Sequence, residues 1–313
     1  MDRALLVAVV VGVVQGIFEW LPISSEGNVA LALSLLGRSP EEAVAFALFL
    51  HVGTAGSAAV YYRTRLGELL RALPRWRPWR DGHRVGSSNS GGAQASLNGA
   101  GTGVAGEGAS TSAGAEGTPG TSAADEEIHR TLTFFAVATL ASGIVGITAY
   151  ETLVGFVSET GGGVFVVVVG VLLVATGAFQ RLSDERATET KTTPTLVDAV
   201  VVGAGQGLAI LPGVSRSGTT TGLLLLRGYE ESRSFELSFV LSIPAALGAG
   251  VLAFLDTGLA VTVGPAVAAL VVAGLVGYLT IDALLRIVER VAFWAVCVGL
   301  GGLAVVGGTV LVV

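Results

Sequence analysis

Residues 162–180, which read GGVFVVVVGVLLVATGAFQ, decide the fold class. This run is apolar on all sides, whereas a membrane-spanning β-strand alternates apolar and polar residues. It is about as long as the roughly 20 residues that a helix needs to cross a bilayer. The sequence therefore predicts an all-α integral membrane protein with six transmembrane helices, because similar stretches occur at 43–62, 131–150, 235–255, 259–281 and 291–313.

The composition agrees with a membrane protein. The chain has 313 residues, of which 51% are hydrophobic and only 13% are charged. A soluble domain carries about 25% charged residues, so too little charge is present to cover a water-facing surface. The single cysteine, Cys297, excludes an internal disulfide and a cysteine-based metal site. We expect no nucleic-acid partner.

Two further segments, 4–36 and 197–226, are apolar at both ends but interrupted by Pro, Gly, Ser and charged residues. A non-helical backbone at membrane depth is tolerated only where protein shields it or where it lines a polar cavity. We therefore expect each segment to be a re-entrant helix pair that enters and leaves on the same side of the membrane.

The two broken segments also resemble each other. Gln15-Gly16-Ile17, followed by Leu21-Pro22 and Ser24-Ser25-Glu26-Gly27, is echoed by Gln206-Gly207-Leu208, followed by Leu211-Pro212 and Ser215-Arg216-Ser217-Gly218. Each half contains one broken segment and three spans, and an odd number of spans inserts the second half upside down. We predict one membrane domain over 1–313, with an inverted-topology repeat formed by 1–181 and 197–313. Such repeats place a polar site near the bilayer midplane.

The distribution of basic residues sets the expected orientation. With the N-terminus outside, all 18 basic residues except Arg3, Arg38 and Arg216 fall in stretches that would be cytoplasmic, as the positive-inside rule requires. The sequence thus predicts a multi-pass protein of the cell membrane with both termini outside and the basic loops cytoplasmic. Residues 82–126 are rich in Gly, Ser, Ala and Thr, and this composition predicts a disordered loop insertion.

Two carboxylates mark the first break. Burying Glu19 and Glu26 in an apolar segment costs roughly 2.5–3.5 kcal/mol each on insertion scales, so such groups are functional candidates. Metal coordination or proton transfer would each use a carboxylate that faces a cavity. The alternative is that both only neutralise a buried arginine.

An arginine marks the second break. Arg216 is flanked by hydroxyl residues and glycine at the start of an apolar helix. Its guanidinium offers a bidentate fork to a phosphate, and free N–H groups at a helix N-terminus add positive potential. This pattern predicts phosphate binding. His51, within an apolar span, is either a hydrogen-bonded core histidine or an auxiliary catalytic group.

At these two motifs the sequence resembles the undecaprenyl-diphosphate phosphatase family of the bacitracin-resistance type, as an archaeal-like variant. The family pattern has Glu or Gln before Gly, then Glu-Phe/Trp-Leu-Pro-Val/Ile-Ser-Ser-x-Gly-His, and later Pro-Gly-x-Ser-Arg-Ser-Gly-x-Thr. Here these positions are Gln15, residues 19–27 and residues 212–220. The similarity covers the whole chain except 82–126.

The resemblance implies a membrane enzyme that removes the terminal phosphate from a long-chain polyprenyl diphosphate and leaves the monophosphate carrier for another round of glycan export. It implies Ser25 as the nucleophile, Glu19 as a catalytic or metal-binding carboxylate, and a divalent cation, Mg²⁺ or Ca²⁺. We assign catalysis to Ser25, Glu19, Glu26 and Arg216, with Glu19 and Glu26 as candidate metal ligands. Substrate contacts are expected from Gln15, Ser24, Gly27, Asn28, Ser215, Ser217, Gly218 and Thr220.

One departure from the family pattern concerns the general base. The histidine that follows the second serine in the family is Asn28 here, and asparagine cannot act as a base. That role falls to Glu26, Glu19 or His51. Gln15 likewise stands where a second carboxylate could bind metal.

A different functional class also fits the architecture. Inverted repeats with broken helices are typical of secondary transporters, so the same phosphate cradle could carry a polyprenyl phosphate across the membrane without cleaving it. The sequence leaves open a homodimer.

Overall fold

The computed structural model describes residues 3–76, 123–159, 161–186, 191–257, 262–288 and 290–312. These residues form helices and no named strand; the only β-pairing among them is an isolated bridge between Lys191 and Tyr229. The α-helices are α1 (Arg3–Phe18), α2 (Ser25–Leu35), α3 (Pro40–Tyr61), α4 (Arg63–Ala72), α5 (Ala123–Glu159), α6 (Gly162–Arg186), α7 (Leu196–Leu208), α8 (Arg216–Leu226), α9 (Glu231–Thr257), α10 (Val263–Val288) and α11 (Phe293–Val312).

Six of these helices are long and apolar enough to cross a membrane: α3, α5, α6, α9, α10 and α11. They correspond to the six predicted spans. Many large apolar side chains on them remain exposed, such as Leu140 at 66% and Leu303 at 72%. The apolar exterior is what a lipid-facing surface requires, so the prediction of an all-α multi-span membrane protein is confirmed.

One boundary prediction is wrong. The predicted loop insertion ends at 126, but residues 123–126 already form the first turn of α5. Asp125 and Glu126 lie in that turn, where acidic residues favour the positive end of the helix dipole, and Arg130 pairs with Glu126 at 2.7 Å. Residues 82–122, the rest of the predicted disordered insertion, lie outside the described residues.

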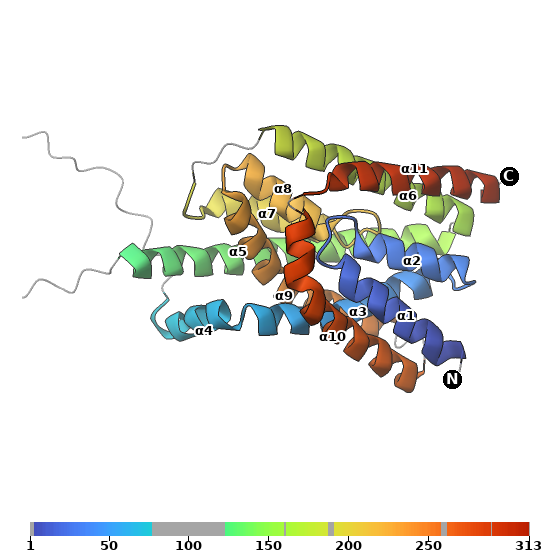
Figure 1. Ribbon diagram of the computed structural model, residues 1–313, viewed down its shortest axis with the longest axis horizontal. Coiled ribbons are helices and arrows are strands. Elements are labelled where there is room, and N and C mark those ends of the chain that lie inside the picture. The colour runs from blue at the N-terminus through green and yellow to red at the C-terminus, as the bar shows by residue number, and fades with distance from the viewer. Residues whose placement is uncertain are drawn as a thin grey trace, which may run out of the picture.

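Both broken segments form helix pairs around an interruption. α1 runs to the middle of the molecule, the chain turns, and α2 returns towards the same end; α7 and α8 do the same from the opposite end (Figure 1). Both chain ends lie at one end of the bundle, away from α4 (Figure 1). Gln15 and Gln206, Gly16 and Gly207, and the starts of α2 and α8 are each separated by 191 residues.

Small residues set the packing of the two halves in the same way. Gly12 and Gly16 bring α1 against Ala269 and Ala273 of α10. In the second half, Gly203 and Gly207 bring α7 against Ala138 and Ser142 of α5, and a Cβ at any of these four glycines would meet backbone. The contact of α1 with α10 in one half therefore corresponds to the contact of α7 with α5 in the other.

The last helices of the two halves pack antiparallel along their length. Gly163 of α6 faces Gly308 of α11, Gly170 faces Gly301, and Gly177 faces Trp294, and the two helices run side by side in Figure 1. This arrangement is what an inverted relation between the halves requires. The boundaries predicted for the two repeats, 1–181 and 197–313, stay a prediction.

Candidate functional site

The tips of the two breaks touch each other in the middle of the bundle. Ser24, whose φ is 59°, is the one non-glycine residue with a positive φ in the described part of the chain. Its hydroxyl accepts hydrogen bonds from the backbone N–H of Gly27 at 3.2 Å and of Gly213 at 3.0 Å. Ser217 donates to the carbonyl of Leu21 at 3.3 Å. Ser24 therefore caps α2 and joins the two breaks.

Four charged or ionisable side chains and one serine converge beside these tips. Glu19 accepts hydrogen bonds from Arg216 Nη2, from Gln15 Nε2 at 2.9 Å and from Ser25 Oγ at 3.0 Å. Ser25 Oγ also lies 3.4 Å from a Glu26 carboxylate oxygen and 3.4 Å from His51 Nε2. Glu19, Ser25, Glu26, His51 and Arg216 are all buried.

His51 links the two carboxylates. Its Nδ1 lies 2.8 Å from the carbonyl of Ala47, which can only accept, so Nδ1 carries a proton. Its Nε2 lies 2.8 Å from Glu26 Oε1 and 3.2 Å from Glu19 Oε2. Nε2 thus lies within hydrogen-bond distance of both carboxylates.

Arg216 retains unused hydrogen-bonding capacity. It begins α8 and is 7% exposed, and Nε and Nη1 are buried without a hydrogen-bond partner among the described residues. A buried donor without a partner costs about 1–3 kcal/mol. Nε–H and the Nη1 hydrogens lie on different edges of the guanidinium, so a bound anion would have to offer each of them a separate acceptor oxygen.

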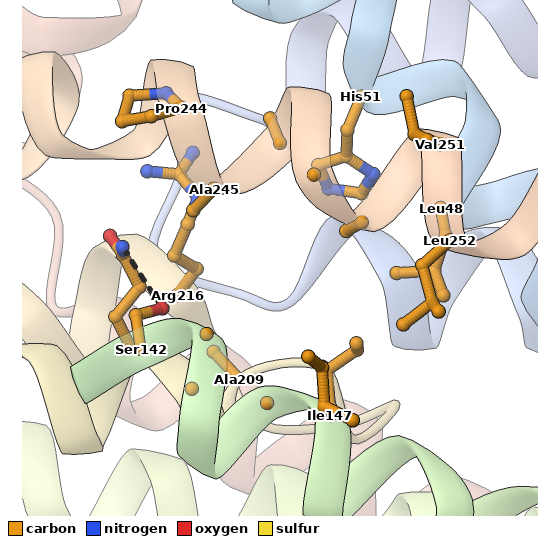
Figure 2. A pocket seen from close by; sticks show the side chains of 18 of the residues that line it. Leu48, His51, Ser142, Ile147, Ala209, Arg216, Pro244, Ala245, Val251 and Leu252 are labelled. Atoms are coloured by element: carbon orange, nitrogen blue, oxygen red, sulfur yellow. Dashed lines mark hydrogen bonds between the residues drawn. The ribbon is translucent and has the colours of Figure 1, made fainter. Parts of the chain in front are cut away.

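The cluster opens into an apolar cavity of about 400 Å³. Figure 2 shows Arg216 and His51 on one side of this cavity, with Pro244, Val251 and Leu252 of α9 and Ile147 of α5 around it. Glu26 also lines it, and most of its remaining wall is apolar. At its outer end Ile147 is 50% exposed and Leu255 is 75% exposed, so the cavity reaches the lipid-facing surface between α5 and α9.

The predicted substrate-contact residues lie at the breaks, but their side chains hold the fold. Asn28 Nδ2 donates to the carbonyls of Ile23 at 2.7 Å and Ser24 at 2.9 Å. Ser215 caps α8 by accepting from Gly218 N–H at 3.2 Å. Thr220 donates to the carbonyl of Arg216 at 2.8 Å. Their direct contact with a substrate stays a prediction.

Glycines at the breaks allow close approach. A Cβ on Gly27 would lie 2.7 Å from the backbone nitrogen of Gly213, where the two tips cross, and the φ of Gly213 is +104°. A Cβ on Gly218 would meet the Gln180 amide, which donates to the Pro22 carbonyl at 2.6 Å. Gly27 is therefore needed for the two breaks to meet, whereas the neighbour of Gly218 is the end of a flexible side chain on α6.

Sequence reasoning left two contacts unassigned. His51 bridges both carboxylates, although its sequence context does not distinguish a core histidine from a catalytic one. Gln206 lines the cavity and donates to Ser142 Oγ at 3.3 Å, the dashed line beside Ser142 in Figure 2. Its likeness to Gln15 in the repeat is the sequence signal that points to it.

The predicted metal ligands have protein partners on all carboxylate oxygens. Glu19 binds Arg216 on one oxygen and Gln15, Ser25 and His51 on the other, while Glu26 contacts His51 and Ser25. Within the described ranges, no group of three or more His, Cys, Asp or Glu residues is arranged so that it could hold a metal ion. In this arrangement the residues do not fit a metal ion, because a cation would have to displace His51 or Arg216.

The chain is similar to known proteins along most of its length. The family model of the bacitracin resistance protein BacA matches residues 8–303. The undecaprenyl-diphosphatase of Haloarcula marismortui is 44% identical over 308 residues, which cover 97% of each chain. The undecaprenyl-diphosphatase of Methanopyrus kandleri is 34% identical over 302 residues, covering 95% of this chain and 93% of that protein. That of Methanococcoides burtonii is 32% identical over 304 residues, or 95% and 96% of the two chains. The chain belongs to the BacA family.

Proposed function

We propose that the protein is a membrane phosphatase that hydrolyses a long-chain polyprenyl diphosphate, similar to undecaprenyl diphosphate, to the monophosphate and inorganic phosphate. The observation that carries this proposal is the convergence of Ser25, two carboxylates and a partly unpartnered Arg216 beside an apolar cavity. The names of the relatives support the same reaction.

The substrate would bind with its two chemically different ends in two different environments. The Nε and Nη1 donors of Arg216 would receive the diphosphate. The first part of the prenyl chain would lie in the apolar cavity and leave between α5 and α9 into the lipid. Burial of apolar surface contributes about 25 cal/mol per Å², so the cavity would add affinity for the chain next to the phosphates.

Cleavage would proceed in two displacements. Ser25 Oγ attacks the terminal phosphorus, the bond from that phosphorus to the bridging oxygen breaks, and the serine proton passes through Glu26 to the departing polyprenyl monophosphate. Water then attacks the phosphoserine. Glu26 takes a proton from the water and returns it to Ser25, and inorganic phosphate leaves.

The contacts of the two carboxylates favour different roles for them. Glu19 binds the guanidinium of Arg216 and three other donors, so it orients the arginine. Among the described residues Glu26 Oε2 contacts only Ser25, and His51 holds the other oxygen at 2.8 Å. We therefore assign the general base to Glu26 and the positioning of that base to His51.

A divalent cation, Mg²⁺ or Ca²⁺, belongs to the proposal through the family resemblance alone. Neither of the two proposed displacements uses this cation, because the carboxylate oxygens of Glu19 and Glu26 already have protein partners. Treatment of purified protein with EDTA, followed by return of each cation, tests the requirement. Loss and recovery of phosphate release would support a cation, and unchanged release in EDTA would remove it from the proposal.

We also propose that both termini face outside and that the basic ends of the helices are cytoplasmic. The positive-inside rule supports this orientation, and so does the position of both chain ends opposite α4 in Figure 1. A homodimer stays open, and molar mass in detergent would test it.

The decisive experiment separates cleavage from transport. Purified protein in vesicles receives polyprenyl diphosphate, and inorganic phosphate and lipid position are both measured. We expect stoichiometric phosphate release that Ser25→Ala abolishes. Movement of labelled lipid phosphate across the vesicle, without phosphate above background, would overturn the phosphatase proposal in favour of a transporter.

A further inference from the structure

Gln206 is a second group in the cavity whose hydrogen-bonding capacity is incompletely used. It lies in the last turn of α7 and is 4% exposed. Its Nε2 lies 3.3 Å from Ser142 Oγ on α5 and 3.5 Å from the carbonyl of Leu241 on α9. A backbone carbonyl can only accept, so this contact fixes which end of the amide is nitrogen.

The other end of the amide has no protein partner. Gln206 Oε1 is buried without a hydrogen bond within the described residues, and Gln206 lines the same cavity as Arg216. Two residues that line this cavity thus hold two unused donors, Arg216 Nε and Nη1, and one unused acceptor, all three buried. A ligand that satisfies all three must offer two acceptor oxygens and one hydrogen-bond donor.

This set of groups distinguishes between tetrahedral anions. A fully ionised anion would satisfy Arg216 but would leave the Gln206 oxygen buried and without a donor, which lowers affinity. A phosphate group that keeps one proton offers oxygens to Arg216 and a P–OH to Gln206. Sulfate has the same shape and carries no proton at neutral pH.

We propose that Gln206 is a specificity-determining residue that accepts a hydrogen bond from the protonated oxygen of the terminal phosphate. This inference rests on the proposed function. Gln206 makes no bond to phosphorus and gives up no proton; it selects a protonated phosphate and fixes its rotation about the Arg216 contact.

Comparison with Gln15 shows why the two equivalent glutamines differ. Gln15 Nε2 donates to Glu19 at 2.9 Å, and Gln15 is completely buried. Its Oε1 also lacks a partner within the described residues, so the two glutamines differ in where they lie and not in this unused acceptor. Gln15 is not one of the residues that line the cavity. Gln206 instead takes its partners from α5 and α9, the two helices that flank the cavity. The same residue type therefore supports a carboxylate in one half and faces the cavity in the other.

The test measures anion binding directly, so it does not depend on turnover. Purified full-length protein is titrated at pH 7 with sodium phosphate and with sodium sulfate by calorimetry. We expect phosphate to bind about tenfold more tightly than sulfate, the size of effect that one hydrogen bond provides. In Gln206→Met, which keeps the length and removes the acceptor, the ratio should fall to about one.

Two further variants keep the test clear if Gln206→Met does not fold. Ser142→Ala removes a partner of Nε2 but keeps the Oε1 acceptor, so the ratio should remain near its original value. Gln206→Glu keeps an acceptor and adds a negative charge, so both anions should bind more weakly while phosphate stays preferred. In turnover assays Gln206→Met should raise KM about tenfold and change kcat by less than about threefold.

Two results would overturn the assignment of Gln206. One is equal affinity of the unmodified protein for phosphate and sulfate. The other is a ratio that Gln206→Met leaves unchanged or that Gln206→Glu abolishes. Failure of the proposed function gives a different result, namely preserved phosphate preference with no phosphate release from polyprenyl diphosphate.

Discussion

The contact between α3 and α10 and the corresponding contact between α5 and α9 differ in one important respect: the first is closed and the second contains the cavity. Gly53 of α3 packs directly on the backbone of α10 at Leu270 and Gly274. In the other half the residue 191 positions later is Pro244 of α9, which lines the cavity that separates α9 from α5. Closure of one side and opening of the other gives the buried cluster a lateral route to the lipid between α5 and α9.

The two breaks differ in chemistry as well. Ser25 begins α2 and Arg216 begins α8, so equivalent positions carry the proposed nucleophile in one half and the proposed phosphate ligand in the other. Glu26 and His51 also belong to the first half. In the proposed mechanism the first half therefore supplies the reacting groups, and the second half supplies the anion contact.

The largest effect is expected from removing the guanidinium of Arg216 in the second break. Arg216→Ala should lower phosphate release more than about a thousandfold, because it removes the phosphate ligand and leaves Glu19 buried without its partner. Arg216→Lys should recover little, since a compact ammonium lacks the planar, spread donors with which a guanidinium contacts Glu19 and a phosphate together. Retention of most activity in a folded Arg216→Ala protein would refute the phosphate contact.

The proposed base should give the next largest effect. Glu26→Gln should lower kcat by about a hundredfold or more, the usual contribution of a general base. Glu185→Gln is the matched control, because Glu185 is 58% exposed in a surface pair with Arg181. Phosphate release measured at saturating substrate compares the two, and similar rates in both variants would exclude catalysis by Glu26.

A substitution in the open α5–α9 contact should change activity, whereas one in the closed α3–α10 contact should change stability. A Cβ on Gly143 of α5, which lines the cavity, meets nothing within 4 Å. Gly143→Leu should therefore fold normally but raise KM about tenfold by displacing roughly two methylenes of the prenyl chain. Gly299→Leu on α11, which is equally unobstructed, should leave KM unchanged.

Gly53→Leu tests the closed side. A side chain there meets the backbone of α10, so overpacking should destabilise the protein by about 1–3 kcal/mol and lower its Tm in detergent. A Tm equal to that of Gly143→Leu would show that the α3–α10 contact is not closed in the way described. A normal KM in Gly143→Leu would show that the prenyl chain does not lie in the cavity.

The spans and the breaks were predictable from sequence because apolar runs and their interruptions are local features. The meeting of Glu19, Ser25 and Arg216 was predictable because the repeat brings the breaks together. The start of α5 was not, since the acids at 125–127 have loop-like composition yet favour a helix N-terminus. The cavity was not predictable either, because its size depends on the distance between α9 at Pro244 and α5, which is not a local feature of the sequence.

The smallest effect is expected at the position where the chain departs from the family motif. Asn28 holds the first break through the carbonyls of Ile23 and Ser24, and its side chain makes no hydrogen bond to Ser25 among the described residues. Asn28→His should therefore bring no gain in kcat and a loss of less than about threefold from its backbone hydrogen bonds. A large gain in phosphate release would assign the base to this position instead of Glu26.

The most direct test of the central claim is the detection of phosphate on Ser25. Protein mixed with substrate labelled in the terminal phosphate is quenched in acid within one turnover, and the labelled peptide is identified. We predict label on Ser25, no label in Ser25→Ala, and none in Arg216→Ala. Full phosphate release by Ser25→Ala, or turnover with no labelled peptide from the unmodified protein, would contradict an attack by Ser25 on a phosphate held by the opposite half.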